Sequence, residues 1–360
     1  MSLSILIAGG GTGGHLYPGI AVARELMARV PDATVAFVGT AAGIEARVVP
    51  REGFTLDVIR SAGLKGKSLA SVARGVSLLP ASAVDAWQVI SRRRPGVVIG
   101  VGGYSSGPVV ALAALRGVPT MLMEQNAVPG LTNRLLAWLV SGAAVTYNES
   151  IAFFGSKAFV SGNPVRPEFF GEAYEQHGSP PGAARVLVFG GSQGAHAINM
   201  AMVEAAARLA AATPRVAITH QTGERDLEVV RDGYRRAGLE ARVEPFLFTM
   251  DREMRSADVV VCRSGATTLA ELTAARRASI LVPFPGATDD HQRKNAEVLV
   301  KEGAARMVEQ RELTGDRLST EILALATDAD MRRQIAEAAG RLARPDAARV
   351  IVDKVLELAK

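Results

Sequence analysis

The feature that most constrains the fold is a motif that occurs once in each half of the chain. LIAGGGTGGH (6–15) and VLVFGGSQGAH (186–196) both contain an apolar run, adjacent glycines, a hydroxyl residue and a further glycine. An apolar run that leads through a glycine turn into a helical pattern is typical of a strand–turn–helix unit in a parallel sheet. The repetition indicates two similar α/β halves.

Short apolar runs alternate with longer helical patterns along both halves. The runs predict strands at 4–8, 34–39, 97–101, 119–123, 143–147, 185–189, 215–220, 257–262 and 279–283. Because these runs are apolar on both faces, we expect parallel sheets covered by helices on both sides. The proline-containing stretch 161–170 and the polar stretch 171–182 predict a linker. The expected fold is α/β, with two Rossmann-like, doubly wound parallel-sheet domains that face a cleft.

Composition narrows the class of protein. The 360 residues are 48% hydrophobic and 21% charged, which favours a folded protein over a disordered one. The single cysteine, Cys262, excludes an intrachain disulfide and favours a reducing cytosol. A net charge of +5 suits anionic ligands or an anionic membrane surface, and sparse aromatic residues argue against a nucleic-acid partner. No apolar run is long enough to predict a transmembrane helix.

Two nucleotide-binding signatures are incomplete. Gly9, Gly11 and Gly14 satisfy the G-x-G-x-x-G spacing of a dinucleotide-binding loop. Such a unit also needs an acidic residue at the end of its second strand, where this chain has Gly39 and Thr40, which argues against an NAD-dependent dehydrogenase. A Walker loop at 61–68 is also disfavoured, because serine occupies the position of its first glycine.

Polar side chains follow the predicted strands of the first half. His15 lies after the first glycine turn, where a neutral imidazole can accept a proton from a substrate hydroxyl; the alternative is a capping or packing histidine. Glu124, Gln125 and Asn126 end another strand, and Asn133 lies in the next helix. These residues form either a capping cluster or a set that reads sugar hydroxyls, since an amide offers both a donor and an acceptor.

The second half contains two further loops of this kind. CRSGATTLAEL (262–272) joins a strand to a helix, so the amides after Gly265 can face a phosphate. Glu271 follows and can accept both hydroxyls of a ribose; the alternative is a solvated helix glutamate. PGATDDHQRKNA (285–296) brings Asp290, His291 and Gln292 to another strand end. Because the spacing lacks a compact two-histidine-plus-carboxylate set, we predict neither a metal nor a cofactor.

Seven motifs together resemble those of the MurG family, glycosyltransferases that add N-acetylglucosamine to the lipid-linked muramyl-pentapeptide precursor of bacterial peptidoglycan. They occur in the family's order and span most of the chain. The motifs are GGTGGH (10–15), GGYSSGP (102–108), EQNAVPGLTN (124–133), GNPVR (162–166), GGSQGA (190–195), CRSGATTLAE (262–271) and DDHQRKNA (289–296). Each is weakly specific alone, whereas the ordered set is highly specific.

The resemblance implies a GT-B fold and a role for each domain. Residues 1–163 would bind the acceptor, undecaprenyl-pyrophosphoryl-MurNAc-pentapeptide, and the membrane, while residues 164–344 would bind UDP-N-acetylglucosamine. The C-terminal helix, about 345–360, would pack back on the first domain.

Residue roles follow from the same resemblance. Glu271 would bind the ribose, Ser192 and Arg166 the diphosphate, and the backbone of Leu247 the uracil. Gln292 would meet the sugar hydroxyls, although His291 beside it stands where some relatives carry glutamine. The remaining implied contacts are Ala266, Thr267, Thr268 and Leu269 with the nucleotide, and Thr12, Gly13, Gly14 and Asn126 with the sugar and the acceptor.

The implied reaction inverts the anomeric carbon. The acceptor's C4 hydroxyl attacks from the face opposite UDP and gives a β-1,4 link. His15 is the candidate base and Glu124 its rival, while helix N-termini and Arg166 would stabilise the departing diphosphate. A UDP-N-acetylglucosamine 2-epimerase and a non-enzymatic nucleotide-binding module remain open as alternatives.

A lipid acceptor without a transmembrane span implies a protein that lies on the cytoplasmic face of the membrane. Segment 65–95 combines the basic Lys65, Lys67, Arg74 and Arg92 to Arg94 with the apolar Leu69, Val72, Val76, Leu78, Leu79 and Trp87. This combination predicts peripheral binding to anionic lipid. The alternative is an amphipathic helix packed on the sheet.

Overall fold

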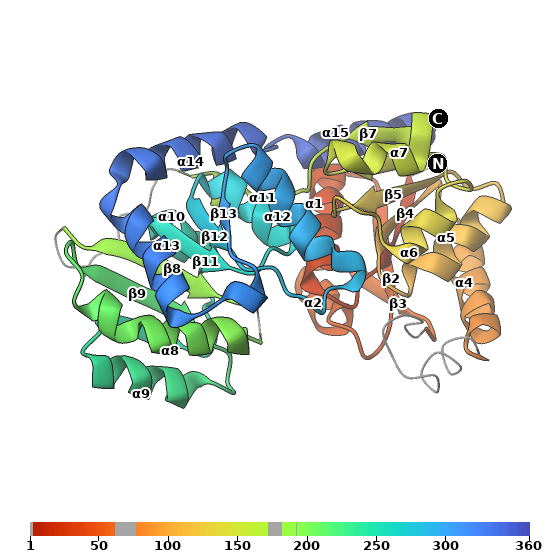
Figure 1. The fold of residues 1–360 in the computed structure, drawn as a ribbon. Helices are drawn as coiled ribbons and strands as arrows, with labels where there is room; N and C mark the ends of the chain where they lie inside the picture. Colours follow the sequence, from red (N-terminus) through yellow and green to blue (C-terminus); the bar gives the residue numbers. More distant parts are fainter. Residues whose placement is uncertain (1–2, 62–76, 172–181, 192) are drawn as a thin grey trace. The chain divides into compact units, whose positions relative to one another are not determined.

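The chain forms two compact units (Figure 1). The computed structural model describes residues 3–61, 77–171, 182–191 and 193–360. Unit 1 consists of Met1–Val165 together with Arg344–Lys360, and unit 2 of Arg166–Ala343. The units therefore divide two residues beyond the boundary expected from the sequence, within the proline-containing stretch.

Unit 1 is built on a parallel sheet with the strand order β3-β2-β1-β4-β5-β6-β7. This order, in which the chain starts in the middle and moves first to one edge and then to the other, is that of a doubly wound fold. The strands are β1 Ser4–Gly9, β2 Thr34–Gly39, β3 Thr55–Val58, β4 Val97–Gly102, β5 Thr120–Glu124, β6 Gly142–Val145 and β7 Ala158–Val160.

Helices cover both faces of this sheet. Along β1, Ile5 and Ile7 pack in one core with α1, whereas Leu6 and Ala8 pack in another with α4 and α5. The alternation follows from the period of two in a strand, and burial on both sides explains why β1 is apolar throughout. The helices are α1 Gly13–Arg29, α2 Glu45–Arg51, α4 Leu79–Arg93, α5 Ser106–Leu115, α6 Leu131–Leu136, α7 Ile151–Phe154 and α15 Ala347–Leu358, with short 3₁₀ turns η1 Asn148–Ser150 and η2 Gly155–Lys157.

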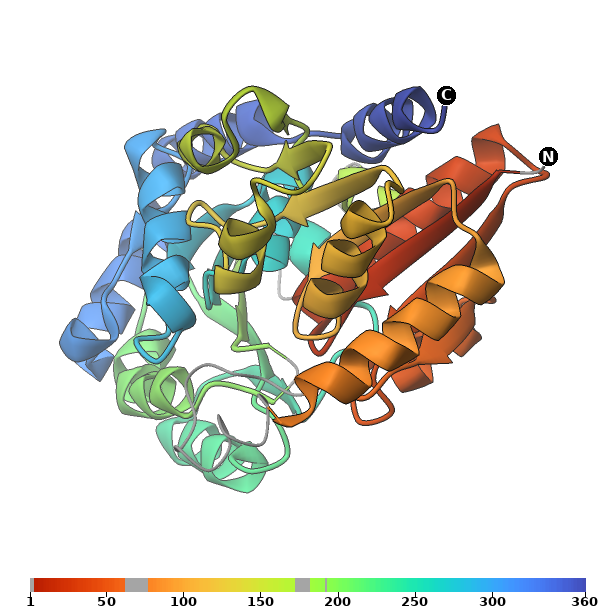
Figure 2. The ribbon, with the colours of Figure 1, turned by 90° about the vertical axis from the view of Figure 1, so that its right-hand side faces the viewer.

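The C-terminal helix belongs to unit 1. In Figure 2 the dark blue α15 lies beside the red α1. Its residues Ile351, Val352 and Val355 are almost fully buried in the core that β1 and α1 share. The first unit is therefore completed by a segment from the far end of the chain.

Unit 2 repeats the doubly wound plan with the order β10-β9-β8-β11-β12-β13. Alternate residues Val186 and Val188 of β8 pack with α8 and α13, while α10 packs against β8 and α11. The strands are β8 Ala184–Phe189, β9 Val216–Gln221, β10 Ala241–Glu244, β11 Val259–Cys262, β12 Ala278–Leu281 and β13 Arg306–Met307. The expected α/β class with parallel doubly wound sheets is thus confirmed for both units.

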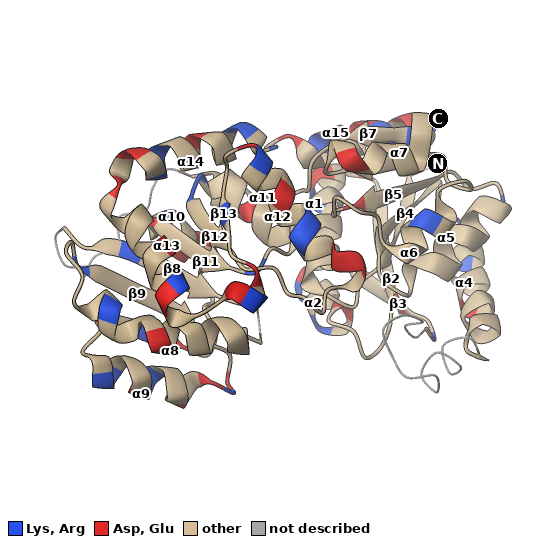
Figure 3. Ribbon diagram, in the orientation of Figure 1, with Lys and Arg blue, Asp and Glu red and all other residues tan. Residues whose placement is uncertain are grey.

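The helices of unit 2 are α8 His196–Ala210, α9 Leu227–Ala237, α10 Met250–Ser256, α11 Ala266–Ala275, α12 His291–Lys301, α13 Gly315–Thr327 and α14 Ala329–Leu342, with 3₁₀ turns η3 Pro167–Phe170, η4 Thr288–Asp290 and η5 Gln310–Glu312. Acidic and basic residues alternate along several of them (Figure 3). Arg231–Glu228 on α9 and Arg317–Glu321 on α13 are examples of pairs within one helix. Among the described residues, no helix is both long and apolar enough to cross a membrane.

Candidate active site

In unit 1, the loops that follow β1 and β4 touch backbone to backbone. These neighbouring strands lie where the strand order reverses, which is where doubly wound sheets bind ligands. Gly9 has φ +140°, and a Cβ there would lie 2.2 Å from the Gly102 carbonyl oxygen. A Cβ on Gly103, at φ +86°, would lie 2.4 Å from the Gly10 carbonyl oxygen. The glycines are needed for this close approach, whatever ligand the loops hold.

His15 lies on the first turn of α1, and its ring packs against Gly102 at the end of β4. Its Nδ1 is 3.1 Å from Oε1 of Gln125, which follows β5. A Cβ on Gly102 would come within 2.9 Å of the same nitrogen, so the imidazole packs directly on the end of β4. Thr12 is exposed at the N-cap of α1, and Gly13 and Gly14 are partly accessible beside it. The structure thus brings His15 together with the residues expected to approach sugar and acceptor.

Glu124 is buried and organises the loop after β5. Its Oε1 accepts hydrogen bonds from the backbone N (2.9 Å) and Nδ2 (3.1 Å) of Asn126. Its Oε2 accepts from the Gly130 backbone N (3.0 Å) and from Asn133 Nδ2 (2.8 Å). The predicted polar group at this strand end therefore does gather, but around a carboxylate whose two oxygens are already occupied.

Glu45 holds the first glycine loop, a role that the sequence did not reveal. It is 1% exposed, and its Oε2 accepts a hydrogen bond from the Gly11 backbone N at 2.8 Å. Its Oε1 accepts from the backbone N and the hydroxyl of Thr40, each at 2.9 Å. A buried carboxylate with three donors rigidifies the loop next to His15.

In unit 2, the N-terminus of α11 faces the carboxyl end of β11. Gly265 occupies the N-cap position, so the cap residue has no side chain to cover the first-turn amides. Thr267 and Thr268 are partly accessible, and Ala266 is nearly buried. Leu269 is fully buried, and its N–H donates to the Gly265 carbonyl.

Glu271 lies on the second turn of α11. Burial raises the pKa of its carboxyl group to about 7, and the nearby positive charge of Arg166 opposes this shift. Arg166 precedes η3, which packs against α11, and its guanidinium lies 5.1 Å from the centre of the Phe169 ring. Glu271, expected to bind the ribose, and Arg166, expected to bind the diphosphate, therefore lie close enough for their charges to interact.

Gln221, at the end of β9, joins two loops that were expected to bind the nucleotide. Its Nε2 donates to the Gly191 carbonyl at 2.8 Å, and its Oε1 accepts from the Leu247 backbone N at 2.9 Å. The N–H of Leu247 is thus already bonded. Ser192 lies outside the described residues. Gln221 has no local signature in the sequence, because its partners come from distant loops.

Gln292 is the second residue of α12 and is partly exposed. Its Oε1 accepts from the Phe284 backbone N at 3.0 Å, and its backbone carbonyl accepts from the Ser264 hydroxyl at 2.8 Å. His291 Nδ1 donates to the Thr288 carbonyl at 2.6 Å. Asp289 and Asp290 have φ of 54° and 56°, an uncommon conformation for residues other than glycine. The turn before α12 is therefore held in a defined shape that links it to the β11–α11 loop.

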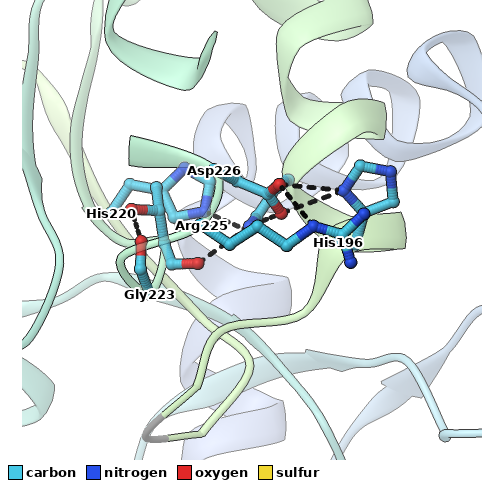
Figure 4. A network of polar contacts seen from close by, with 7 residues as sticks. His196, His220, Gly223, Arg225 and Asp226 are labelled. Carbon is cyan, nitrogen blue, oxygen red and sulfur yellow. Dashed lines mark hydrogen bonds and ion pairs between the residues drawn. The ribbon is translucent and has the colours of Figure 1, made fainter. Parts of the chain in front are cut away.

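A polar network joins the starts of α8 and α9 to the end of β9 (Figure 4). The Tyr234 hydroxyl donates to His220 Nδ1 (2.6 Å), and His220 Nε2 donates to Asn199 Oδ1 (3.0 Å). Asn199 Nδ2 and His196 Nδ1 then donate to Asp226, at 2.8 and 3.0 Å. Burial lowers the pKa of His220 to about 3, so this imidazole stays neutral. The network fixes the starts of α8 and α9 relative to β9, a role that the sequence did not predict.

Comparison with protein families and curated proteins gives consistent matches. Residues 5–145 match the glycosyltransferase family 28 N-terminal domain, and residues 185–351 match its C-terminal domain. The UDP-N-acetylglucosamine–N-acetylmuramyl-(pentapeptide) pyrophosphoryl-undecaprenol N-acetylglucosamine transferase of Anaeromyxobacter sp. (strain K) is 49% identical, covering 99% of this chain and 94% of that protein. The protein of the same name from Myxococcus xanthus (strain DK1622) is 45% identical, covering 99% and 93%.

Solved structures show the same architecture. The crystal structure of Acinetobacter baumannii MurG is similar with a TM-score of 0.80 and 28% identity, covering 99% of both chains. The UDP-GlcNAc 2-epimerase from Neisseria meningitidis, solved with UDP-GlcNAc, has a TM-score of 0.70 at 12% identity, covering 99% of this chain and 100% of that one. At that identity the second likeness concerns the fold alone.

Proposed function

This chain belongs to the family of UDP-N-acetylglucosamine–N-acetylmuramyl-(pentapeptide) pyrophosphoryl-undecaprenol N-acetylglucosamine transferases, and we propose that it performs the reaction for which its relatives are named. It moves N-acetylglucosamine from UDP-N-acetylglucosamine to the C4 hydroxyl of lipid-linked N-acetylmuramyl-pentapeptide, a step in peptidoglycan synthesis. The observation that carries this proposal is 49% identity to such an enzyme over 99% of the chain.

The donor nucleotide binds to unit 2 in this proposal. Glu271 accepts the two ribose hydroxyls, the carbonyl of Leu247 accepts from uracil, and Gln292 donates to a sugar hydroxyl through its amide nitrogen. The amides at the start of α11, where Gly265 is the N-cap residue, and the charge of Arg166 stabilise the diphosphate as it departs. Ser192, in the loop that Gln221 holds, is a further diphosphate contact.

The acceptor hydroxyl loses its proton to His15 in unit 1. Polar groups beside the acceptor come from Asn126, Asn133 and the start of α1, residues Thr12 to Gly14. Glu124 is the weaker candidate for the base because each of its oxygens already accepts two hydrogen bonds. Attack of the hydroxyl oxygen forms the new glycosidic bond as the bond from the anomeric carbon to UDP breaks, with inversion at that carbon.

The lipid acceptor requires a membrane-facing surface. Unit 1 offers exposed apolar side chains on and just after α4 to α6, where α4 packs against α5 and α5 against α6. Trp87 on α4 is 52% exposed, Leu135 on α6 is 62% exposed and Trp138 is 74% exposed. Arg116 lies over the Trp87 ring at 4.3 Å, and Lys157 donates to the Trp138 carbonyl, so cations adjoin both tryptophans. Peripheral binding at the cytoplasmic face of an anionic membrane accounts for this combination.

The structure describes only the later part of the segment expected to bind the membrane. Arg92 and Arg93 form ion pairs with Asp57 at 2.6 and 2.8 Å, so their charges are partly neutralised within unit 1. Leu79 is exposed, but Leu78 is only half-exposed. Lys65, Lys67, Leu69, Val72, Arg74 and Val76 lie outside the described residues. The surface named above therefore centres on Trp87, Leu135 and Trp138.

Product analysis tests the proposed reaction. With UDP-N-acetylglucosamine and lipid-linked muramyl-pentapeptide, the protein should form a β-1,4-linked disaccharide, identified by NMR of the released sugar. His15→Ala should lower turnover by about 10²–10⁴-fold with little change in UDP affinity, because a base acts on the transition state and not on donor binding. An α-linkage, or attachment to a hydroxyl other than that of C4, would refute the proposed reaction. A His15→Ala variant with near-native turnover would refute only the role of His15 as the base.

A further inference from the structure

We infer that Gln125 is a positioning residue that fixes the proton of the His15 imidazole on Nδ1 and leaves Nε2 as the proton acceptor. The catalytic part of this inference rests on the proposed function, in which His15 is the base. The protonation pattern itself is a property of the protein without substrate and can be measured separately.

The orientation of the Gln125 amide follows from its two partners. Gln125 is 2% exposed and stands at the end of β5. Its Nε2 donates to the Val101 carbonyl at 3.2 Å. A carbonyl can only accept a hydrogen bond, so the NH₂ group must point toward Val101 and the oxygen must point the other way. That oxygen lies 3.1 Å from His15 Nδ1.

The orientation of the amide determines the tautomer of His15. Since Oε1 of Gln125 can only accept, Nδ1 of the neutral imidazole must carry the hydrogen and donate it. Nε2 then holds the lone pair on the opposite side of the ring. The imidazole cannot turn away easily, because it packs on Gly102, where even a Cβ would come within 2.9 Å of Nδ1. The hydrogen bonds therefore form one chain, in which His15 donates to Gln125 and Gln125 donates to the Val101 carbonyl.

Ionisable groups on the elements around His15 include Glu124 at the end of β5, Glu45 in α2, Tyr104 after β4 and Tyr17 in α1. The oxygens of Glu124 accept from Asn126, Gly130 and Asn133, and those of Glu45 accept from Gly11 and Thr40. The imidazole instead meets the neutral amide of Gln125. A neutral acceptor fixes the tautomer without the strong preference for imidazolium that a carboxylate partner would create.

NMR of protein labelled with ¹⁵N-histidine tests the tautomer directly. We expect the His15 signals, assigned by their loss in His15→Ala, to show a protonated Nδ1 and an unprotonated Nε2 at pH 8. In Gln125→Leu the signals should move toward the other tautomer, because nothing then accepts from Nδ1. A wild-type His15 protonated on Nε2 would overturn the inference, even if Gln125→Leu fails to fold.

Kinetics test the consequence for the reaction with UDP-N-acetylglucosamine and lipid-linked muramyl-pentapeptide. Gln125→Leu should lower kcat about 10- to 100-fold and leave KM for the donor within about twofold. Gln125→Glu should retain more activity than Gln125→Leu but move the acid limb of the pH–rate profile to higher pH, because a carboxylate stabilises the protonated imidazole. An unchanged profile in Gln125→Glu, or a native kcat in folded Gln125→Leu, would contradict the inference.

A matched control separates positioning from stability. Leu122 lies on the same strand, is fully buried and packs in the core with α4 and α5. Leu122→Val should lower the melting temperature without moving either the His15 signals or the pH–rate profile. If the wild type shows no acceptor-dependent UDP release, the proposed function fails while the tautomer result stands; an active wild type with an unaltered tautomer in Gln125→Leu contradicts the inference alone.

Discussion

We expect Glu271 to lower the stability of the fold and, in the proposed function, to bind the donor; the substitution Glu271→Gln tests both expectations. Burial raises the pKa of its carboxyl group to about 7 from the value of 4.5 in an unfolded chain. Between these two values the folded state holds a proton that the unfolded state has lost, so stability falls as pH rises through this window. Glu271→Gln removes this cost, on the order of 1–3 kcal/mol above pH 7.

Melting curves and calorimetry measure both effects. The melting temperature of Glu271→Gln relative to wild type should rise between pH 5 and pH 8, while its affinity for UDP should fall by about 1–3 kcal/mol, since a ribose hydroxyl loses a charged acceptor. A melting difference that is the same at both pH values would contradict the raised pKa of the Glu271 carboxyl group, and an unchanged UDP affinity would contradict the ribose contact.

Which residues gather at the site was predictable where they follow strand ends. His15 follows β1, Glu124 ends β5, and Asn126 and Asn133 follow β5. Parallel strands bring their carboxyl ends to one edge of the sheet. The supporting residues were not predictable. Gln125 meets His15 across 110 positions of sequence, and Gln221 and Glu45 bind backbone groups that carry no side-chain signal. Such contacts depend on where loops are placed in space, which periodicity does not reveal.

The predicted strands are the central ones, and the four strands that the sequence analysis missed are all edges. β3 and β7 flank the sheet of unit 1, and β10 and β13 flank that of unit 2. ARVE in β10 and RM in β13 contain exposed or half-exposed charged residues, because an edge strand is covered less completely than a central one. Apolar periodicity therefore detects burial, and it fails where a strand is short and partly solvated.

The C-terminal helix α15 should be essential to unit 1 only. Ile351→Ala removes buried atoms from the core shared with β1 and α1 and should cost about 2–4 kcal/mol of unfolding free energy. Both tryptophans, Trp87 and Trp138, belong to unit 1, so tryptophan fluorescence during urea unfolding reports on that unit. UDP affinity reports on unit 2 and should not change.

Glu357→Ala is the matched control for α15. Glu357 is exposed and pairs with Lys354 one turn away, so its loss should change the unfolding free energy by less than about 0.5 kcal/mol. Equal effects of Ile351→Ala and Glu357→Ala would show that the helix does not contribute to the core.

Membrane association should depend on unit 1. Replacing Leu135 and Trp138 with Ser removes two large exposed apolar side chains and should weaken binding to anionic vesicles by at least about tenfold. The control exchanges Val229 and Val300 of unit 2, which are also exposed, for Ser. Sedimentation with vesicles at low and high salt should show loss only in the first variant and weaker wild-type binding at high salt. Equal binding by both variants would contradict this membrane surface.

Release of UDP with and without the lipid acceptor decides whether the chain is the proposed transferase. Purified protein is incubated with labelled UDP-N-acetylglucosamine, in the presence or absence of lipid-linked muramyl-pentapeptide, and free UDP is measured over time. The account predicts rapid release only with the acceptor, in a one-to-one ratio with labelled lipid product. Release that is equally fast without the acceptor, or formation of the 2-epimeric sugar with no labelled lipid, would contradict it.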